Sequence, residues 1–300
     1  MATAASKRPA PTCAPPRQPG RKPKLILPPG ACDSHFHVLG PWGKFPFSDE
    51  RTFTPSDSTK EQIFALHKNL GIERGVAVQS SSTYGTDNSA LLDLIAAGGG
   101  RYRGVAVIDG PFDDKMLQKL HDGGVRAVRY YDLEHLRALQ ASDFRRRLAD
   151  AIRPLGWHMV FLGDIRKRSV MDELLSFRLP LVLDHMGRHA WRPDDPNGID
   201  QEAFRTLLSL QRNELMWVKI GCADRSSRTG APFSDIVPYA RALVDAAPDR
   251  VLWGTDFPHN HHDNMPDDAD LVDFIGNIAS TPEKIMKLMV DNPTRLYWSN

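Results

Sequence analysis

Short apolar runs alternate with amphipathic stretches along the chain from about residue 30 onward. Eight runs have the length and composition of buried strands, namely 31–37, 75–79, 103–107, 125–130, 157–162, 180–184, 215–221 and 250–254. Apolar residues at helical spacing lie between them, over 60–70, 88–97, 113–121, 144–155, 201–212 and 235–247, and a last helix is expected within 281–300. Alternating strands and helices predict βαβ units and a parallel sheet. Eight units is the number in a (β/α)₈ barrel.

A doubly wound open sheet is the competing architecture. It would place a glycine-rich phosphate-binding turn after the first strand, where this chain has His35-Phe36-His37. We therefore predict an α/β fold of the (β/α)₈ TIM-barrel type over residues 28–300. A composition of 41% hydrophobic and 25% charged residues is typical of a globular chain.

Residues 1–27 differ in composition from the rest. The first 24 residues hold six basic and no acidic side chains, so a chain of net charge +1 carries −5 over the remainder. We expect 1–27 to be a disordered, Pro-rich basic tail. It lacks the interleaved aromatic residues of a nucleic-acid module, and no stretch has the ~18 apolar residues of a membrane span. Three cysteines without CxxC spacing fit a reducing compartment, so we expect a cytoplasmic protein, monomeric or homo-oligomeric, with no nucleic-acid or membrane partner.

Polar residues follow several predicted strands at the point where each strand ends, the edge at which barrels carry their chemistry. His35 and His37 share one face of the first strand because side chains alternate along it. His185 follows the sixth strand and Asp256 the eighth, which closes onto the first. This set predicts a general base or a metal site at the barrel mouth.

Arginines end three different strands: Arg129 the fourth, Arg188 the sixth and Arg225 the seventh. Guanidinium groups bind carboxylates through paired hydrogen bonds, so we expect these three to bind an anionic ligand. Ser81, in a Ser-rich loop after the second strand, is a weaker candidate for substrate binding. His259, in the His-rich segment after Asp256, is another, whereas His261 and His262 are expected to be solvated.

These residues belong to longer motifs. They are the HxH at 35–37, Phe45-Pro46-Phe47, Thr52-Phe53-Thr54-Pro55, Asp184-His185-Met186-Gly187-Arg188, the segment 251–259 with its TDxPH signature, and 291–298. Over residues 28–298 the chain resembles the amidohydrolase superfamily, and within it the group of 2-pyrone-4,6-dicarboxylate lactonases and 4-sulfomuconolactone hydrolases. The resemblance implies a lactone hydrolase of aromatic-compound catabolism. Asp256 would activate water, His35, His37 and His185 would polarise the lactone carbonyl, and the arginines would hold the substrate's anionic groups.

The chain departs from the superfamily pattern at possible metal ligands. The fourth strand ends in Arg129-Tyr130-Tyr131, where a metal-binding member has a Lys or Glu. The fifth strand has His158 at its start, whereas a metal ligand would be needed at its carboxyl end. A binuclear site is therefore not expected. A single Zn²⁺ on His35, His37, His185 and Asp256 is chemically sensible, but the absent ligands favour an enzyme with no obligatory cofactor.

The substrate is less sharply defined. Leu162 and His135 stand where the lactonase group has a Tyr and a further basic residue, with Tyr130 or Tyr131 as a substitute. We favour 2-pyrone-4,6-dicarboxylate, with 4-sulfomuconolactone and a bound zinc as the close alternative. An amidohydrolase-type decarboxylase and a sugar-acid lactone isomerase are further alternatives. A non-catalytic anion-binding barrel would need the arginines but not Asp256 and the three histidines.

Overall fold

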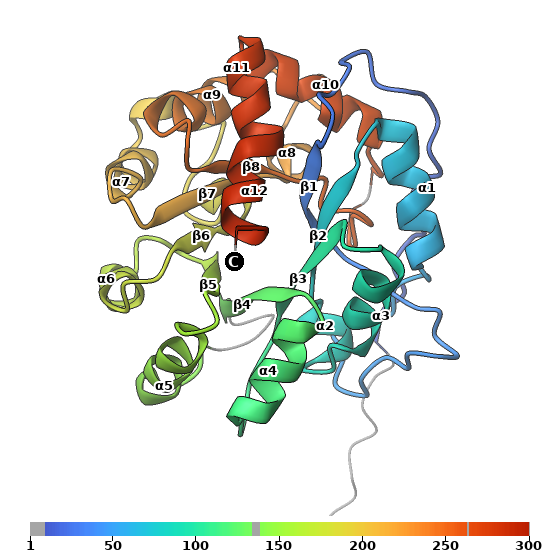
Figure 1. The fold of residues 1–300 in the computed structure, drawn as a ribbon. Helices are drawn as coiled ribbons and strands as arrows, with labels where there is room; N and C mark the ends of the chain where they lie inside the picture. Colours follow the sequence, from blue (N-terminus) through green and yellow to red (C-terminus); the bar gives the residue numbers. More distant parts are fainter. Residues whose placement is uncertain (1–9, 134–138, 263, 300) are drawn as a thin grey trace, which may run out of the picture.

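In a computed structural model of the chain, residues 10–133, 139–262 and 264–299 are described; His135, named above, lies outside them. Eight parallel strands form one sheet in sequence order. They are β1 (Cys32–Phe36), β2 (Arg74–Val78), β3 (Tyr102–Ala106), β4 (Val125–Asp132), β5 (His158–Gly163), β6 (Leu181–Leu183), β7 (Met216–Ile220) and β8 (Val251–Trp253). The sheet curls into a ring (Figure 1).

The ring closes where the first strand meets the segment after the last one. The backbone N–H of Asp256 donates to the carbonyl of His35 at 2.8 Å, and that of His37 donates to the carbonyl of Phe257 at 2.8 Å. Gly254 makes this approach possible, because a Cβ there would lie 2.6 Å from the Cβ of His35. The predicted (β/α)₈ barrel is confirmed.

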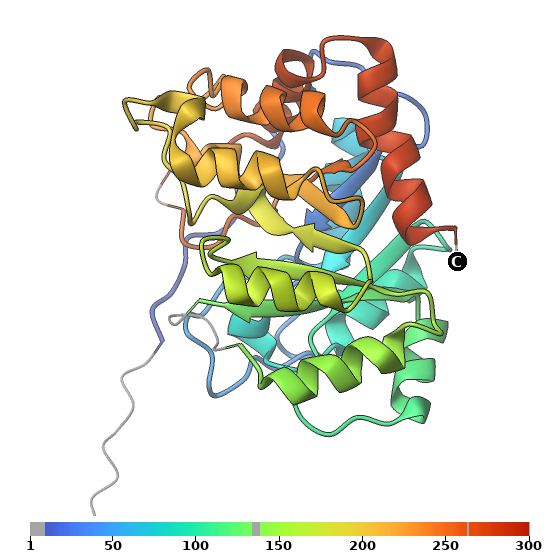
Figure 2. The same cartoon turned by 90° about the vertical axis from the view of Figure 1, so that its left-hand side faces the viewer.

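Helices cover the outside of the ring (Figures 1 and 2). They are α1 (Lys60–Leu70), α2 (Ser81–Tyr84), α3 (Ser89–Ala97), α4 (Asp114–Asp122), α5 (Ser142–Ile152), α6 (Arg168–Ser176), α7 (Glu202–Leu210), α8 (Ala223–Ser226), α9 (Val237–Ala246), α10 (Asp268–Ile278), α11 (Pro282–Met286) and α12 (Asn292–Tyr297). Helices α2, α6, α8 and α10 lie outside the predicted helical stretches. No helix among the described residues is long and apolar enough to cross a membrane.

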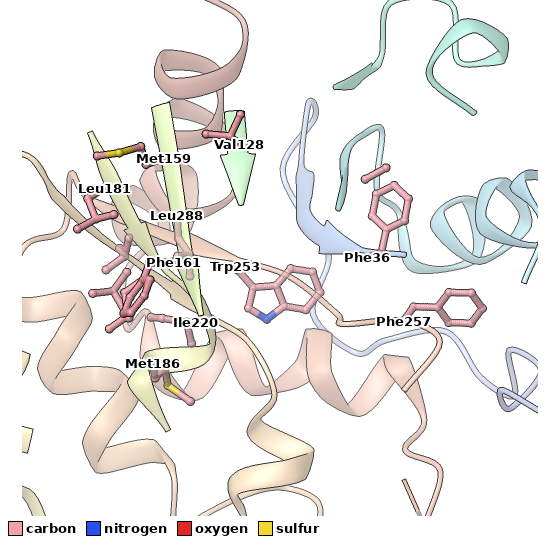
Figure 3. Packing of buried hydrophobic residues seen from close by; sticks show 14 of the residues in the cluster. Phe36, Val128, Met159, Phe161, Leu181, Met186, Ile220, Trp253, Phe257 and Leu288 are labelled. Atoms are coloured by element: carbon pink, nitrogen blue, oxygen red, sulfur yellow. The ribbon is translucent and has the colours of Figure 1, made fainter. Parts of the chain in front are cut away.

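Two apolar layers hold the barrel together. Large side chains, among them Phe161, Ile220 and Trp253, fill the space between ring and helices (Figure 3). Small residues such as Val76, Val105 and Ala127 line the inside. Helix α12 lies across the amino-terminal end of the barrel (Figure 1), with Leu296 and Tyr297 in contact with this inner layer. The opposite end, where the strands finish, is left for the functional site.

The prediction of a disordered tail needs correction over residues 10–27. The backbone N–H of Cys13 donates to the carbonyl of Thr54 at 2.9 Å, and Thr12 and Thr54 form a parallel bridge. Further along, Arg21 forms ion pairs with Asp270 and Asp273 on α10. The acidic face of α10 therefore binds a basic segment whose composition alone indicated no partner.

Candidate active site

A cavity of about 470 Å³ opens at the carboxyl end of the barrel. Six of the residues singled out from the sequence line it: His37, Arg129, His185, Arg188, Arg225 and Asp256. Thr52, Phe53, Ser80, Ser82, Tyr131, Leu133, Leu162, His189, Cys222, Asn260 and His261 complete the wall. His35 is fully buried beneath it. A single hollow thus combines a carboxylate, imidazoles and cationic groups.

Asp256 lies at the centre of the polar groups. Its Oδ1 is 3.5 Å from Nε2 of His35, 3.6 Å from Nε2 of His37 and 3.8 Å from Nε2 of His185. Its Oδ2 accepts hydrogen bonds from Cys222 Sγ at 3.0 Å and from Arg225 Nε at 3.2 Å. Burial opposes ionisation, but the positive charge of Arg225 and its hydrogen bond to Oδ2 help hold the pKa of this carboxyl well below its usual value. Asp256 is therefore a carboxylate able to accept a proton.

In His37 and His185, the hydrogen bond made by Nδ1 determines whether Nε2 directs a hydrogen or a lone pair at Asp256. His37 Nδ1 lies 2.7 Å from the carbonyl oxygen of Val78, an acceptor, so Nδ1 carries a hydrogen, and in the neutral ring Nε2 carries a lone pair. Burial, reinforced by Asp256, raises the pKa of the Cys222 thiol well above its usual value. The thiol donates to Asp256, so its sulfur accepts from His185 Nδ1 at 3.1 Å. His185 Nε2 therefore also presents a lone pair.

His35 belongs to a different network. Its Nδ1 lies 3.1 Å from Lys219 Nζ and 3.3 Å from Asp184 Oδ1. Burial and the charge of Lys219 lower the pKa of His35 to about 3, so the ring is neutral. Arg129 donates to Asp184 Oδ2 from Nε at 2.8 Å and contacts it from Nη2 at 2.7 Å. One carboxylate thus joins two cations below the cavity.

The three arginines differ in how many hydrogen bonds and ion pairs their guanidinium groups already make with protein groups. Arg129 is held by Asp184 and by the hydroxyl of Tyr131 at 2.9 Å. Arg225 donates to Asp256 and, from Nη2, to the carbonyl of Asn260 at 2.7 Å. Arg188 has no side-chain ion pair within the described residues, and its buried Nε has no hydrogen-bond partner there. Arg188 is the guanidinium most available to an incoming anion.

The family follows from the sequence comparisons. The model of the family described as amidohydrolase matches residues 32–298. This chain belongs to the amidohydrolase family. It is 43% identical to a 2-pyrone-4,6-dicarboxylate hydrolase of Comamonas testosteroni over 288 residues, covering 92% of this chain and 93% of that protein. It is 36% identical to a 4-sulfomuconolactone hydrolase of Hydrogenophaga intermedia, covering 96% and 95%. An apo structure from Agrobacterium tumefaciens has a TM-score of 0.76 at 25% identity, covering 93% of this amidohydrolase and 99% of that chain.

Amidohydrolases often bind a metal, and the polar groups around Asp256 include possible metal ligands. Ligand atoms of three sets lie within 4.8 Å of one another: His35, His37 and Asp256; His185, Cys222 and Asp256; and His35, Asp184 and His185. Ligand atoms of a tetrahedral zinc are about 3.3 Å apart for bonds of about 2.0 Å. The separations of 3.5, 3.6 and 3.8 Å around Asp256 Oδ1 are close to that value. His35 Nε2 also lacks a hydrogen-bond partner among the described residues. In the spacing of their ligand atoms, the residues therefore fit one zinc ion.

Three predicted substrate-binding residues, Tyr130, Ser81 and His259, are not among those that line the cavity. Strand β4 extends two residues beyond the predicted end, so Tyr131 shares the inner face with Arg129 while Tyr130 is buried in the core. Helix α2 begins at Ser81, and Ser80 and Ser82 line the wall instead.

His259 lies behind the cavity between two carboxylates. Its Nε2 is 3.0 Å from Asp268 and its Nδ1 is 3.5 Å from Asp224. Burial opposes protonation, but these carboxylates raise the pKa of His259 to about 10. The histidine is thus charged and ties together the segments after β7 and β8 and the start of α10. His262, expected to be solvated, lies 3.1 Å from Asp224, and the exposed His261 packs 4.1 Å from the ring of Phe53.

Sequence reasoning missed several buried polar residues. Asp33 accepts from the backbone of His35 at 3.0 Å and from the backbone and hydroxyl of Thr255 at 3.1 and 2.6 Å, and so fixes the first strand to the TDxPH segment. Lys219, Cys222 and Asp184 complete the networks around the histidines. Of these residues, Lys219 is the one that the sequence could have indicated, because it is the single charged residue of an otherwise apolar strand, β7.

Proposed function

We propose that this amidohydrolase opens a small anionic lactone by hydrolysis, with 2-pyrone-4,6-dicarboxylate as the favoured substrate. The observation that carries the proposal is the ionised Asp256 facing His37 and His185 in a cavity that also holds Arg188, which has no ion pair among the described residues. The identity of 43% with a hydrolase of that substrate supports the choice.

Asp256 acts as the general base. A water between Asp256 Oδ1 and the Nε2 lone pairs of His37 and His185 donates one hydrogen to the carboxylate and the other to a ring nitrogen. The water oxygen bonds to the lactone carbonyl carbon as Asp256 takes its proton. The bond from that carbon to the ring oxygen then breaks, and the ring oxygen leaves with the electron pair and takes the proton held by Asp256. The new carboxylic acid releases the second water hydrogen to solvent, so the products are a carboxylate, an enol and a proton.

Anion binding and carbonyl polarisation fall to other residues. Arg188 binds a substrate carboxylate directly, and Arg225 lies between the substrate and Asp256, where it can bind an anion while keeping the base ionised. Of the three histidines, we assign the hydrogen on Nε2 to His35, and with it the role of donor to the carbonyl oxygen as negative charge develops there.

Hydrolysis of 4-sulfomuconolactone is the second candidate, and the fit of the histidines and Asp256 to one zinc favours it. Such a metal would be held by His35, His37, His185 and Asp256, and it would acidify a bound water and polarise the carbonyl. In that case Asp256 could not serve freely as the base, and the arginines would bind the carboxylate and the sulfonate.

A spectrophotometric assay separates these functions. The purified protein is given 2-pyrone-4,6-dicarboxylate and 4-sulfomuconolactone, each with and without a chelator. We expect loss of the pyrone absorbance that resists the chelator. Activity confined to the sulfonated lactone and abolished by chelation would reverse the order of the two candidates. Binding of both without turnover would leave only an anion-binding barrel.

A further inference from the structure

We propose that Lys219 is a positioning residue that fixes the hydrogen-bonding state of His35, keeping a hydrogen on Nε2 and so making this histidine a donor to the substrate and a poor metal ligand. The catalytic part of this inference rests on the proposed lactonase function. The part that concerns His35 and metal binding does not.

The hydrogen bonds of His35 lead to this assignment. An ammonium group offers three donors and no acceptor. Because Lys219 Nζ lies 3.1 Å from His35 Nδ1, that nitrogen must supply the lone pair, and the single hydrogen of the neutral ring is on Nε2. The rival arrangement would have Nδ1–H donate to Asp184 Oδ1, 3.3 Å away. Among the described residues, however, Asp184 Oδ1 has no partner in hydrogen-bond geometry.

The surroundings keep Lys219 in place. The side chain is fully buried inside the barrel, on the same face of β7 as Trp217. Its Nζ lies 3.1 Å from Asp184 Oδ1, and Arg129 binds the other oxygen of that carboxylate. Burial lowers the pKa of Lys219 and Asp184 opposes this effect. Lys219 contacts Nδ1 of His35, the ring nitrogen that does not face Asp256, so it acts through His35 and not on the substrate.

The state of His35 matters because the three histidines then present unlike atoms to Asp256. His37 and His185 offer lone pairs, whereas His35 offers an N–H directed at the carboxylate, its Nε2 lying 3.5 Å from Asp256 Oδ1. A metal would need the lone pair of His35 Nε2, which requires the hydrogen to move to Nδ1. That move is blocked while Lys219 donates there, and the ammonium also repels a cation. Without Lys219, Asp184 is placed to accept from Nδ1–H, the carboxylate–histidine arrangement that supports zinc ligands elsewhere.

The test compares wild type with Lys219→Met, which removes the donors and the charge at similar length. Lys167→Met is the matched control. Lys167 makes an ion pair with Asp132 at 3.0 Å, close to the 3.1 Å between Lys219 and Asp184, but it is half exposed. Nitrogen-15 NMR of the histidine rings, assigned with a His35→Gln variant, reports which nitrogen carries the hydrogen. Cobalt(II) titration, followed by visible absorption, reports metal affinity without any activity.

We expect wild type and Lys167→Met to show His35 hydrogenated on Nε2 and to bind cobalt weakly. Lys219→Met should show the hydrogen on Nδ1 and bind cobalt about 10–100-fold more tightly, the range by which outer partners of metal ligands act. If the proposed function also holds, its kcat for the lactone should fall with little change in KM.

Two results would overturn the proposal: a hydrogen on Nδ1 of His35 in the wild type, or equal cobalt affinity in a folded Lys219→Met. The wild-type spectrum remains decisive even if that variant fails to fold. A protein that hydrolyses neither lactone would refute the proposed function and leave the NMR and cobalt results as an independent test of Lys219.

Discussion

Replacement of Arg188 by Met tests how the cavity recognises its ligand. Arg188 lies after β6, reaches the cavity wall and has no side-chain ion pair within the described part of the chain. Met keeps most of the side-chain volume and removes all five N–H donors. The variant should therefore lose the contact with a substrate carboxylate and leave the network around Asp256 intact.

The size of the loss can be worked out from the contact. A guanidinium bound to a carboxylate makes two charge-assisted hydrogen bonds of about 1.5–3 kcal/mol each. Arg188 is only partly buried, so solvent screening places the total near the lower limit, about 3 kcal/mol. At 1.4 kcal/mol per tenfold change, this corresponds to about a 10²-fold fall in kcat/KM, mostly through KM.

Steady-state kinetics on the dicarboxylate lactone and on an uncharged lactone measure the effect. Only the charged substrate should respond to Arg188→Met. Arg225→Met should differ by lowering kcat as well, because Arg225 also donates to Asp256. Arg228, exposed and outside the cavity wall, provides the control Arg228→Met. Equal losses on charged and uncharged lactones would refute the assignment of Arg188 as an anion-binding residue.

Three further variants test other parts of the site. Asp256→Asn should abolish turnover while retaining calorimetric binding of an unreactive aromatic dicarboxylate; near-normal kcat would show that the base is misassigned. His259 has its pKa raised from 6.5 to about 10, so its contribution to stability is complete below pH 6.5 and lost as pH rises through about 10. His259→Gln should therefore lower the free energy of unfolding by a few kcal/mol at pH 6 and by little at pH 10.5; a loss independent of pH would contradict this. Gly254→Ala, whose Cβ would lie 2.6 Å from His35, should cost about 1–3 kcal/mol and reduce kcat, and unchanged melting and activity would disprove the close packing.

The barrel could be predicted because each strand carries its own signal of apolar residues between helical patterns. Helix α6 was missed although it is as long as α3 and α7, which were predicted and likewise have no side-chain cap. The sequence left Tyr130 and Tyr131 both open as candidates because β4 was predicted to end at residue 130. With the strand continuing to Asp132, alternation places Tyr131 on the face of Arg129 and Tyr130 on the opposite face.

The central polar residues were predictable from their places at strand ends, since parallel strands bring these ends together. Their partners were not, because they come from distant parts of the chain. Asp184 meets Lys219 and Arg129 across the barrel, and His259 meets Asp268 on a helix that was not predicted. These contacts determine which arginine is free to bind a ligand. That arginine could therefore be identified only from the structure.

The most direct test of the account is hydrolysis of 2-pyrone-4,6-dicarboxylate by wild-type protein stripped of metal, with residual metal quantified, before and after addition of zinc. The account predicts full turnover by the metal-free protein, with Asp256 as the base and His35 as a donor, and no gain from zinc. Turnover that is lost on stripping and restored by zinc would contradict it, and would make His35 a metal ligand.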